Sequence, residues 1–440
     1  MTVIEEIRTA PVFCADVETT GTNWLTDSVF GVAVAVPGCS IEDLVADPAG
    51  APVRATYFDT RRDPGQYREF ADAVHHAAGP YVNHNAKFDA HMLLNDGCRV
   101  DLKRAECTMI RAALIDEHRH RYDLDTVAKD YMEITKRGEV YEELAELFGG
   151  RVTRKAQIGN LQRAPVSVVR PYAEKDAEVA LRLWAWQQGE IERQQLHEVW
   201  GLEKRLFRHV FDMERRGIRV DIDEAKTRAE ELTAKIDHTQ RELDRMAGFH
   251  INPNPSGSIV SLFEPYQDEG GDWWAKDGTS LTATPAGTPS LNADALPRME
   301  HPAAAGILRL RKMIKTRDTF ILGHIVGHAH RGRVHPSINQ TKGDDTGGTS
   351  TGRLSYTGPA LQQIPNRDKE IASIVRPIFL PEKDQVWAYG DLDQHELRVF
   401  FSYARPREIL KRYRENPDTD GHQVAADLTG LPRNKGPEGG

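Results

Sequence analysis

The chain has 440 residues, a formal net charge of −9, 39% hydrophobic residues and 28% charged residues. These values predict a globular protein with two or three domains, and no run approaches the roughly 18 apolar residues of a membrane span. The four cysteines form no C-x-x-C pair, and residues 1–9 lack the apolar segment of a secretory signal. We therefore expect a cytoplasmic protein with reduced thiols and no membrane contact.

The first 198 residues alternate between strand and helix patterns, which predicts an α/β domain. Residues 12–15 form a short apolar run that ends on Asp16, and residues 29–36 form a longer apolar run. Each run is predicted to be a strand, and the polar stretch between them has the composition of a turn.

The remaining residues follow a different pattern. The predicted elements, in chain order, are long charged helices over 203–245 with a short strand at 218–220, loops over 252–290, a helical stretch over 303–330, a β-rich region, an apolar strand at 385–390 and a helix at about 394–403.

Four acidic residues of the first region are candidates for a metal site. Asp16 and Glu18 are two apart on a predicted strand, so both side chains can point to one face. Asp89 lies in the first turn of a predicted helix, and Asp176 lies in a later helix with Tyr172 on the same face. Carboxylate oxygens suit Mg²⁺, and a pair of such ions could activate water and stabilise the leaving oxygen of a phosphodiester.

The order of these segments resembles the DEDD exonuclease superfamily, in the subgroup with Tyr in the third motif. Residues 16–19, 85–89 and 172–176 resemble its three motifs. The resemblance implies a ribonuclease H-like fold, two Mg²⁺ ions held by the four carboxylates, and 3′→5′ hydrolysis of single-stranded 3′ ends. It also implies that Tyr172 orients the attacking water.

Two further residues of the second motif, Asn85 and Lys87, each allow two interpretations. The resemblance implies that Asn85 and Lys87 help to hold the DNA strand. From the residues alone, Asn85 could equally be a helix N-cap and Lys87 a solvated side chain.

Segments of the second half resemble family A DNA polymerases of the pol I-like, phage type. The thumb of these enzymes is similar to residues 212–221, 251–254 and 312–320. Lys312 and Lys315 lie on a basic helix that could bind duplex phosphates, although such a helix taken alone is more often a solvated face. Arg353 and Gln362 lie in segments that resemble the palm at the primer end, which implies that both contact primer–template DNA.

Residues 391–398 resemble motif A of the same polymerases. The apolar strand predicted at 385–390 would deliver Asp391 to the point where a helix begins. The resemblance implies that Asp391 binds the polymerase metal ions, and that Gln394 and Glu396 contact the dNTP, with Glu396 excluding a ribose 2′-OH.

The sequence therefore predicts three regions in an α/β chain: an exonuclease domain at 1–198, a helical thumb at 199–330 and a partial α+β polymerase palm at 331–440. We expect the fingers and the second palm carboxylate to come from a second chain or from a longer native protein, in a bacterial or phage-infected cell. DNA synthesis with dNTPs is expected only in that completed enzyme. Two alternatives stay open: a stand-alone DEDD exonuclease acting on RNA, and an inactive remnant that binds primer–template junctions.

Overall fold

The computed structural model describes residues 2–135, 139–254, 257–342, 348–349 and 351–430. Contacts divide the chain into two compact units, Met1–Leu380 and Pro381–Gly440, and each unit is described by itself. Within the described ranges, no helix is both long enough and apolar enough to cross a lipid bilayer.

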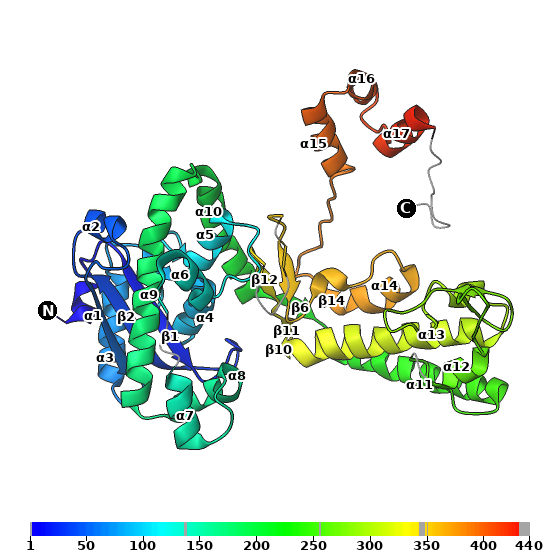
Figure 1. Ribbon diagram of the computed structural model, residues 1–440, viewed down its shortest axis with the longest axis horizontal. Coiled ribbons are helices and arrows are strands. Elements are labelled where there is room, and N and C mark those ends of the chain that lie inside the picture. Colours follow the sequence, from blue (N-terminus) through cyan, green and yellow to red (C-terminus); the bar gives the residue numbers. More distant parts are fainter. Residues whose placement is uncertain (1, 136–138, 255–256, 343–347, 350, 431–440) are drawn as a thin grey trace. The chain divides into compact units, whose positions relative to one another are not determined.

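A five-stranded mixed sheet forms the centre of the N-terminal part of the first unit (Figure 1). Its strands are β1 (Phe13–Thr19), β2 (Val29–Pro37), β3 (Val53–Asp59), β4 (Tyr81–Asn83) and β5 (Glu106–Cys107). In the order β3-β2-β1-β4-β5, β1 pairs antiparallel with β2 and parallel with β4, so it is an interior strand. Both predicted strands are confirmed, although β1 continues beyond the apolar run to Thr19.

Helices pack around this sheet. They are α1 (Val3–Glu6), α2 (Ile41–Ala46), α3 (Pro64–His75), α4 (Ala86–Asn95), α5 (Thr108–Ile115), α6 (Leu124–Met132), α7 (Val140–Phe148), α8 (Arg154–Gln157), the short 3₁₀ helix η1 (Ile158–Arg163) and α9 (Val166–Arg193). The long helix α9 packs across β1, β2 and β3. Because side chains alternate along β1, Phe13, Ala15 and Val17 enter one core and Cys14 enters another.

The next helix, α10 (His197–Arg216), belongs partly to the first of these cores, because Trp200, Phe207 and Phe211 pack there with Phe13. It ends at Gly217, which has a φ of 60°. A Cβ at this position would lie 2.8 Å from the Val334 carbonyl oxygen, so only glycine fits. The chain then enters β6 (Ile218–Val220), which confirms the short strand predicted there.

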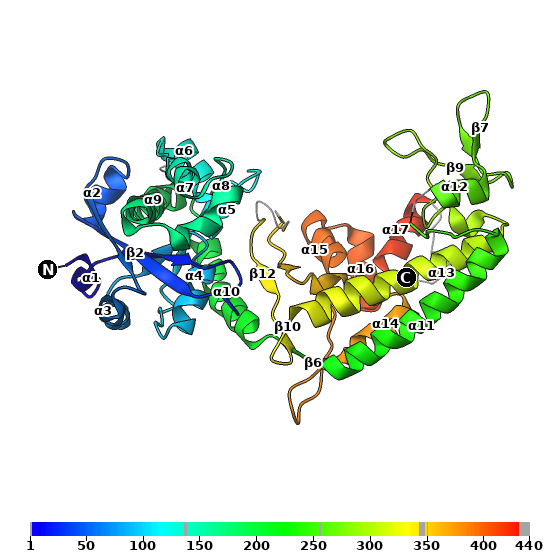
Figure 2. The ribbon, with the colours of Figure 1, turned by 90° about the horizontal axis from the view of Figure 1, so that it is seen from below.

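Two long helices, α11 (Ile222–Ala247) and α13 (Ala303–Lys315), lie side by side (Figure 2). Asp221 caps α11 by accepting a hydrogen bond from the Glu224 amide at 3.0 Å. Leu243, Ile307 and Leu310 are fully buried in the core between the helices. The predicted charged helix over this stretch is confirmed.

Residues 252–290 contain more structure than the predicted loops. Between α11 and α13 lie α12 (Gly257–Phe263), a small sheet of β7 (Tyr266–Gln267), β8 (Trp273–Trp274) and β9 (Ser280–Leu281), and the 3₁₀ turn η2 (Leu296–Arg298). The loop prediction is wrong for these segments, because strands of two residues are too short to show an alternating pattern.

After α13 the helical path continues and then gives way to short strands. The elements are the π-helical stretch η3 (Thr316–Ile325), the 3₁₀ turn η4 (Val326–His328), β10 (Ala329–His330), β11 (Arg333–Val334), β12 (Ser337–Asn339), β13 (Ser355–Thr357), η5 (Leu361–Gln363), α14 (Lys369–Val375), η6 (Arg376–Ile378) and β14 (Phe379–Leu380). One sheet has the order β10-β11-β6-β14, and β12 and β13 form a separate antiparallel hairpin. The helix predicted at 303–330 is thus confirmed up to His328.

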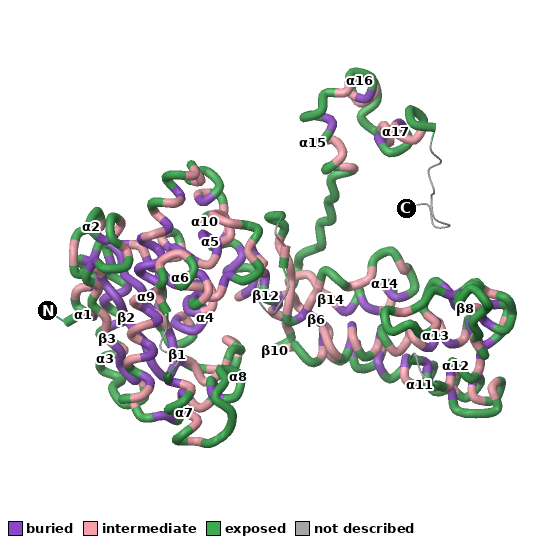
Figure 3. Tube along the Cα trace, in the orientation of Figure 1, coloured by how far each residue is buried: buried purple, intermediate pink, exposed green. Residues whose placement is uncertain are grey.

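In the second unit, residues 381–430 form three helices, α15 (His395–Ala404), α16 (Arg407–Glu415) and α17 (Gly421–Thr429). Phe401, Ile409 and Val424 form their small shared core. The helix predicted at 394–403 is confirmed, but residues 385–390 are not a strand. These residues are exposed (Figure 3), Tyr389 by 80%, and no described strand pairs with them, so their backbone groups lack the partners that a sheet supplies.

Candidate functional site

The first two candidate residues lie on the interior strand β1. Asp16 is half-buried and Glu18 is buried, and they pair across the sheet with Ala33 and Gly31 of β2. A Cβ at Gly31 would clash with the Tyr57 hydroxyl, so the Tyr57 side chain occupies the space that this glycine leaves. The register between β1 and β2 shifts directly after Glu18, an irregularity that re-aims side chains near functional sites.

Asp89 reaches the same strand from helix α4. Its Oδ1 accepts a hydrogen bond from the Val17 amide at 3.1 Å, so the second motif is joined to the backbone of the first. Burial, followed by the negative charges of Asp16 and Glu18, raises the pKa of Asp89 well above its ordinary range. Three carboxylates from two elements therefore share one electrostatic environment.

Helix α9 contributes Asp176 and Tyr172, both buried and one turn apart. Burial, then Asp176 and Glu18, raise the pKa of Tyr172, so it stays a phenol at neutral pH. The buried Cys14 thiol also has a raised pKa, caused by burial and then by Asp16, Asp89 and Asp176. The sequence-predicted set of four carboxylates is thus brought together from β1, α4 and α9.

Two residues near this site were not singled out by the sequence. Tyr141 of α7 packs edge-on to Tyr172, with ring centroids 6.3 Å apart. Burial opposes the charge of Arg154 in α8, yet the neighbouring Tyr141, Tyr172 and Asp176 raise the pKa of this guanidinium. Both come from the helices that follow the second motif, where no spacing rule marks them.

The donor set fits Mg²⁺ in its chemistry, because it consists of carboxylate oxygens whose mutual repulsion a divalent cation would relieve. In the part of the chain that the structure describes, however, no three His, Cys, Asp or Glu side chains are gathered closely enough to hold an ion as they stand. The carboxylates therefore fit the metal ions in their chemistry, and the ligand set itself remains a proposal.

The two flanking residues of the second motif behave differently from the expected strand contacts. Asn85 is the exposed N-cap position of α4, with a φ of 60° and no side-chain capping bond. The Lys87 ammonium lies 2.6 Å from Glu214 Oε1 and also donates to the Ile338 carbonyl oxygen. The expected DNA contact of Lys87 is not supported, because its charge is already paired inside the protein.

The basic helix α13 shows a similar difference. Lys312 Nζ lies 2.7 Å from both Asp368 Oδ2 and Glu370 Oε2 at the start of α14, so its charge is neutralised within the chain. Lys315 is exposed, and its ammonium lies 5.8 Å from the centroid of the Phe320 ring. Lys315 is thus the better candidate for a phosphate contact, and the expected role of Lys312 is not supported.

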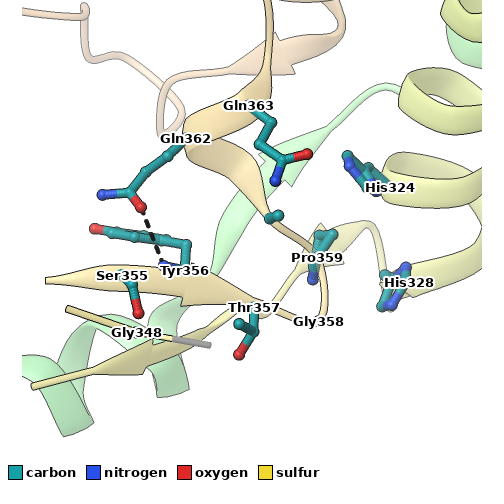
Figure 4. A pocket seen from close by; sticks show the side chains of 11 residues that line it. His324, His328, Gly348, Ser355, Tyr356, Thr357, Gly358, Pro359, Gln362 and Gln363 are labelled. Atoms are coloured by element: carbon teal, nitrogen blue, oxygen red, sulfur yellow. Dashed lines mark hydrogen bonds between the residues drawn. The ribbon is translucent and has the colours of Figure 1, made fainter. Parts of the chain in front are cut away.

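A cavity of about 550 Å³ lies beside the segment predicted to contact the primer (Figure 4). Gln362 is fixed there by two bonds to the strand edge: its Oε1 accepts from the Tyr356 amide at 3.2 Å and its Nε2 donates to the Leu354 carbonyl at 2.9 Å. Arg353 is exposed at the start of this segment. His324 and His328 line the cavity from the opposite side.

In the second unit, the motif A residues are exposed rather than assembled into a site. Asp391 and Glu396 are exposed. Gln394 Oε1 accepts from the Gly421 amide at 2.7 Å and from the Tyr413 hydroxyl at 3.2 Å. The expected dNTP contact of Gln394 is not supported, because its amide oxygen links α15 to α17 instead.

Comparisons with known proteins match the N-terminal and C-terminal halves of the chain to two different family models. Residues 1–191 match the model of the 3′-5′ exonuclease family, and residues 222–435 match that of DNA polymerase family A. DNA polymerase DpoZ of Salmonella phage PMBT28 is 54% identical over all of this chain and 69% of its own length. DNA polymerase DpoZ of Acinetobacter phage SH-Ab 15497 is 54% identical over 97% of this chain and 67% of its own length.

A solved structure, the POL domain of Pol1 from M. smegmatis in complex with DNA primer-template and dNTP, matches with a TM-score of 0.68. It is 21% identical and covers 99% of this chain, which covers 66% of it, so the likeness concerns the fold. The domain boundaries at 198 and 330 stay predictions. The matches at high identity decide the family: the chain belongs to the family A DNA polymerases and carries a 3′-5′ exonuclease domain.

Proposed function

We propose that the chain shortens DNA from the 3′ end at the site formed by Asp16, Glu18, Asp89 and Asp176. One observation carries this proposal: Asp89 is hydrogen-bonded to the backbone of β1, and burial, together with the charges of Asp16 and Glu18, raises its pKa. Separate elements thus concentrate negative charge in one place, at a cost that a bound cation would offset.

The four carboxylates would hold two Mg²⁺ ions, which supply an activated water and stabilisation of the leaving oxygen. Tyr172 would orient the attacking water through its phenol, which burial and the neighbouring carboxylates keep protonated. Arg154 adds a cation beside Asp176, where it can attract the backbone phosphate of the substrate. Frayed or mismatched 3′ ends would be preferred, because unpairing them costs a few kcal/mol less.

The polymerase half would bind the primer–template through Arg353 and Lys315, which are exposed. Template-directed synthesis would require residues 385–390 to join a palm sheet. Their exposed Val386, Trp387 and Tyr389 are residue types that favour a paired and covered strand. We propose that further palm and finger residues, in a second chain or in a longer polypeptide, pair with this segment and place Asp391 and Glu396 at the dNTP.

The test is a time course on a 5′-labelled primer–template with Mg²⁺, with and without dNTPs, and after removal of metal with EDTA. Stepwise shortening that EDTA and Asp16→Ala abolish would support the proposal. Asp72→Ala is the matched control, because Asp72 is an exposed carboxylate of α3 that pairs with Arg8.

Other outcomes would select the alternatives. No shortening by the wild-type chain would leave a primer–template binding protein. Faster hydrolysis of ribo-oligonucleotides than of DNA would indicate a nuclease that acts on RNA. Extension of the primer by this chain alone would contradict the need for further palm residues.

A further inference from the structure

Helix α4 has two functional faces. Asp89 points to β1, where it accepts the hydrogen bond of the Val17 amide. Lys87 and His91 lie two residues before and after it, and both point to helix α10. The position of Asp89 therefore depends on what holds the opposite face of its helix.

That face is held by one buried carboxylate, Glu214 of α10, whose side chain is 2% exposed. Glu214 Oε1 lies 2.6 Å from Lys87 Nζ and also accepts from the Ile338 amide, and Glu214 Oε2 lies 2.8 Å from His91 Nε2. Because a carboxylate can only accept here, His91 donates through Nε2. Burial opposes the ionisation of Glu214, but His91, Lys87 and the Ile338 amide together lower its pKa.

The His91 ring is fixed as well. It is stacked between Trp24, with centroids 4.3 Å apart, and Phe211, with centroids 4.1 Å apart. The guanidinium of Arg215 lies over the Trp24 ring, 4.9 Å from its centroid. The helix that carries Asp89 is thus bound to α10 by a charge pair, a hydrogen bond and the ring contact of His91 with Phe211, and to the β1–β2 loop by the ring contact with Trp24.

The same carboxylate also reaches the polymerase half. Ile338 belongs to β12 and is paired in register with Tyr356 of β13, whose amide is bound by Gln362. The Lys87 ammonium donates to the Ile338 carbonyl, so Lys87 and Glu214 together satisfy both backbone groups of this residue. The hairpin beside the segments predicted to contact the primer, which carry Arg353 and Gln362, is therefore joined to α4 through two side chains.

The contact region between α4 and the β12–β13 hairpin contains a cavity. A cavity of about 340 Å³ lies between α4 and the hairpin, and Trp24, Lys87, Glu214, Asn339 and Thr357 are among its lining residues. The two elements thus have space to shift relative to each other while the Glu214 contacts set their spacing.

We propose that Glu214 is a positioning residue for the exonuclease reaction: it holds the helix of Asp89 against the β12–β13 hairpin, so that paired primer bound at the hairpin changes the exonuclease rate. This inference rests on the proposed exonuclease function. Without the carboxylate, the Lys87 ammonium and the Ile338 amide lose their buried partner, and α4 is free to move from the hairpin.

The first test compares Glu214→Gln and Lys87→Met with the wild-type full chain. Glu224→Gln is the matched control, because Glu224 forms a partly exposed pair with Arg228 on α11. Hydrolysis is measured with Mg²⁺ on a single strand and on the same strand paired to a template. We expect kcat on the single strand to fall about tenfold, with KM within about twofold, as for partners that orient a catalytic group.

The decisive reading is the ratio of the two rates. In both variants we expect the ratio of hydrolysis on single-stranded and paired ends to move toward one by at least about threefold. Equal losses on both substrates, with the wild-type ratio kept, would overturn the coupling and leave Glu214 a residue of the fold alone.

A second measurement does not need activity. In EDTA, hydrogen–deuterium exchange of residues 86–95 is followed with and without primer–template in the full chain. We expect DNA to change this exchange in the wild type and in Glu224→Gln, but not in Glu214→Gln. The same change in all three proteins would overturn the proposal. A wild-type chain that shows the exchange change and no hydrolysis would uphold the link and refute the exonuclease function.

Discussion

The two acidic segments of the chain, Asp16–Glu18 and Asp391–Asp393, follow apolar runs of similar character but reach opposite structural states. The first lies on β1, which pairs with β2 on one edge and β4 on the other and is covered on both faces. The second follows residues 385–390, which are exposed and pair with no described strand. A strand is thus defined by its neighbours, because its backbone groups need partners that its own sequence cannot supply.

The largest expected effect concerns the acids themselves. Asp89→Asn should lower the exonuclease rate by roughly 10³–10⁴-fold, as when one member of a set that acts as a unit is removed. Asp391→Asn should leave the exonuclease rate of this chain unchanged, because Asp391 is exposed in a separate unit. Initial rates on a single-stranded oligonucleotide measure both. A large loss of exonuclease rate from Asp391→Asn would show that the second acidic segment also takes part in the nuclease reaction.

The next effect concerns the apolar runs. Phe30 of β2 is 1% exposed, and Phe30→Ala should lower the free energy of unfolding by about 3–5 kcal/mol. Tyr389→Ala should change it by less than about 0.5 kcal/mol, because Tyr389 is 80% exposed. Urea unfolding of the full chain, followed by far-UV circular dichroism, gives both values. A loss above 2 kcal/mol from Tyr389→Ala would show that residues 385–390 are already packed in solution, because burial of an apolar ring stabilises the folded state by roughly that amount.

The comparison extends to the two lysines of α13. Lys315→Ala should reduce the salt dependence of primer–template binding by about 0.9 in log–log slope, the share of one phosphate contact. Lys312→Ala should change this slope much less, because Asp368 and Glu370 already neutralise Lys312. Fluorescence anisotropy at several salt concentrations measures the slope. Equal slopes for the two variants would restore the DNA contact predicted for Lys312.

The smallest effect is a pH dependence at the same place. Burial opposes the charge of Asp368, but Lys312 and the Ile371 amide lower its folded-state pKa. The stabilisation is therefore present above the unfolded pKa of about 3.9 and is lost as the pH falls through the lower folded value. Asp368→Asn should cost less than about 1 kcal/mol at neutral pH.

The stability difference at acid pH is the control for this assignment. The gap between wild type and Asp368→Asn should close as the pH falls below about 4. Urea midpoints measured from pH 7 to pH 3 follow the gap, and a gap that widens toward acid pH would contradict the assignment.

Much of the nuclease half could be predicted from the sequence, because its motifs lie on elements with clear periodicity. Alternation along β1 placed Asp16 and Glu18 on one face, and the i, i+4 spacing placed Tyr172 and Asp176 together on α9. The strand at 385–390 failed under the same rules, because apolar content does not reveal whether a partner strand is present.

The contacts of single charged side chains could not be predicted. Lys87 and Lys312 carry the charge expected of DNA contacts, and both are paired with acids more than fifty residues away in the chain. Glu214 did leave a signal, because it continues the spacing of Phe207, Val210 and Phe211 on the buried face of α10. An acid at such a position indicates a buried partner, but the sequence does not say which one.

Helix α10 has a consequence for dissecting the molecule. Trp200, Phe207 and Phe211 complete the core beneath the nuclease sheet, and Glu214 satisfies Lys87 and His91. A nuclease excised at residue 198 would lose all of these side chains and expose an apolar groove where α10 had been. An autonomous nuclease, or one transplanted to another polymerase, must therefore keep the chain through Arg216, and it needs a substitute for the Ile338 backbone at its new junction.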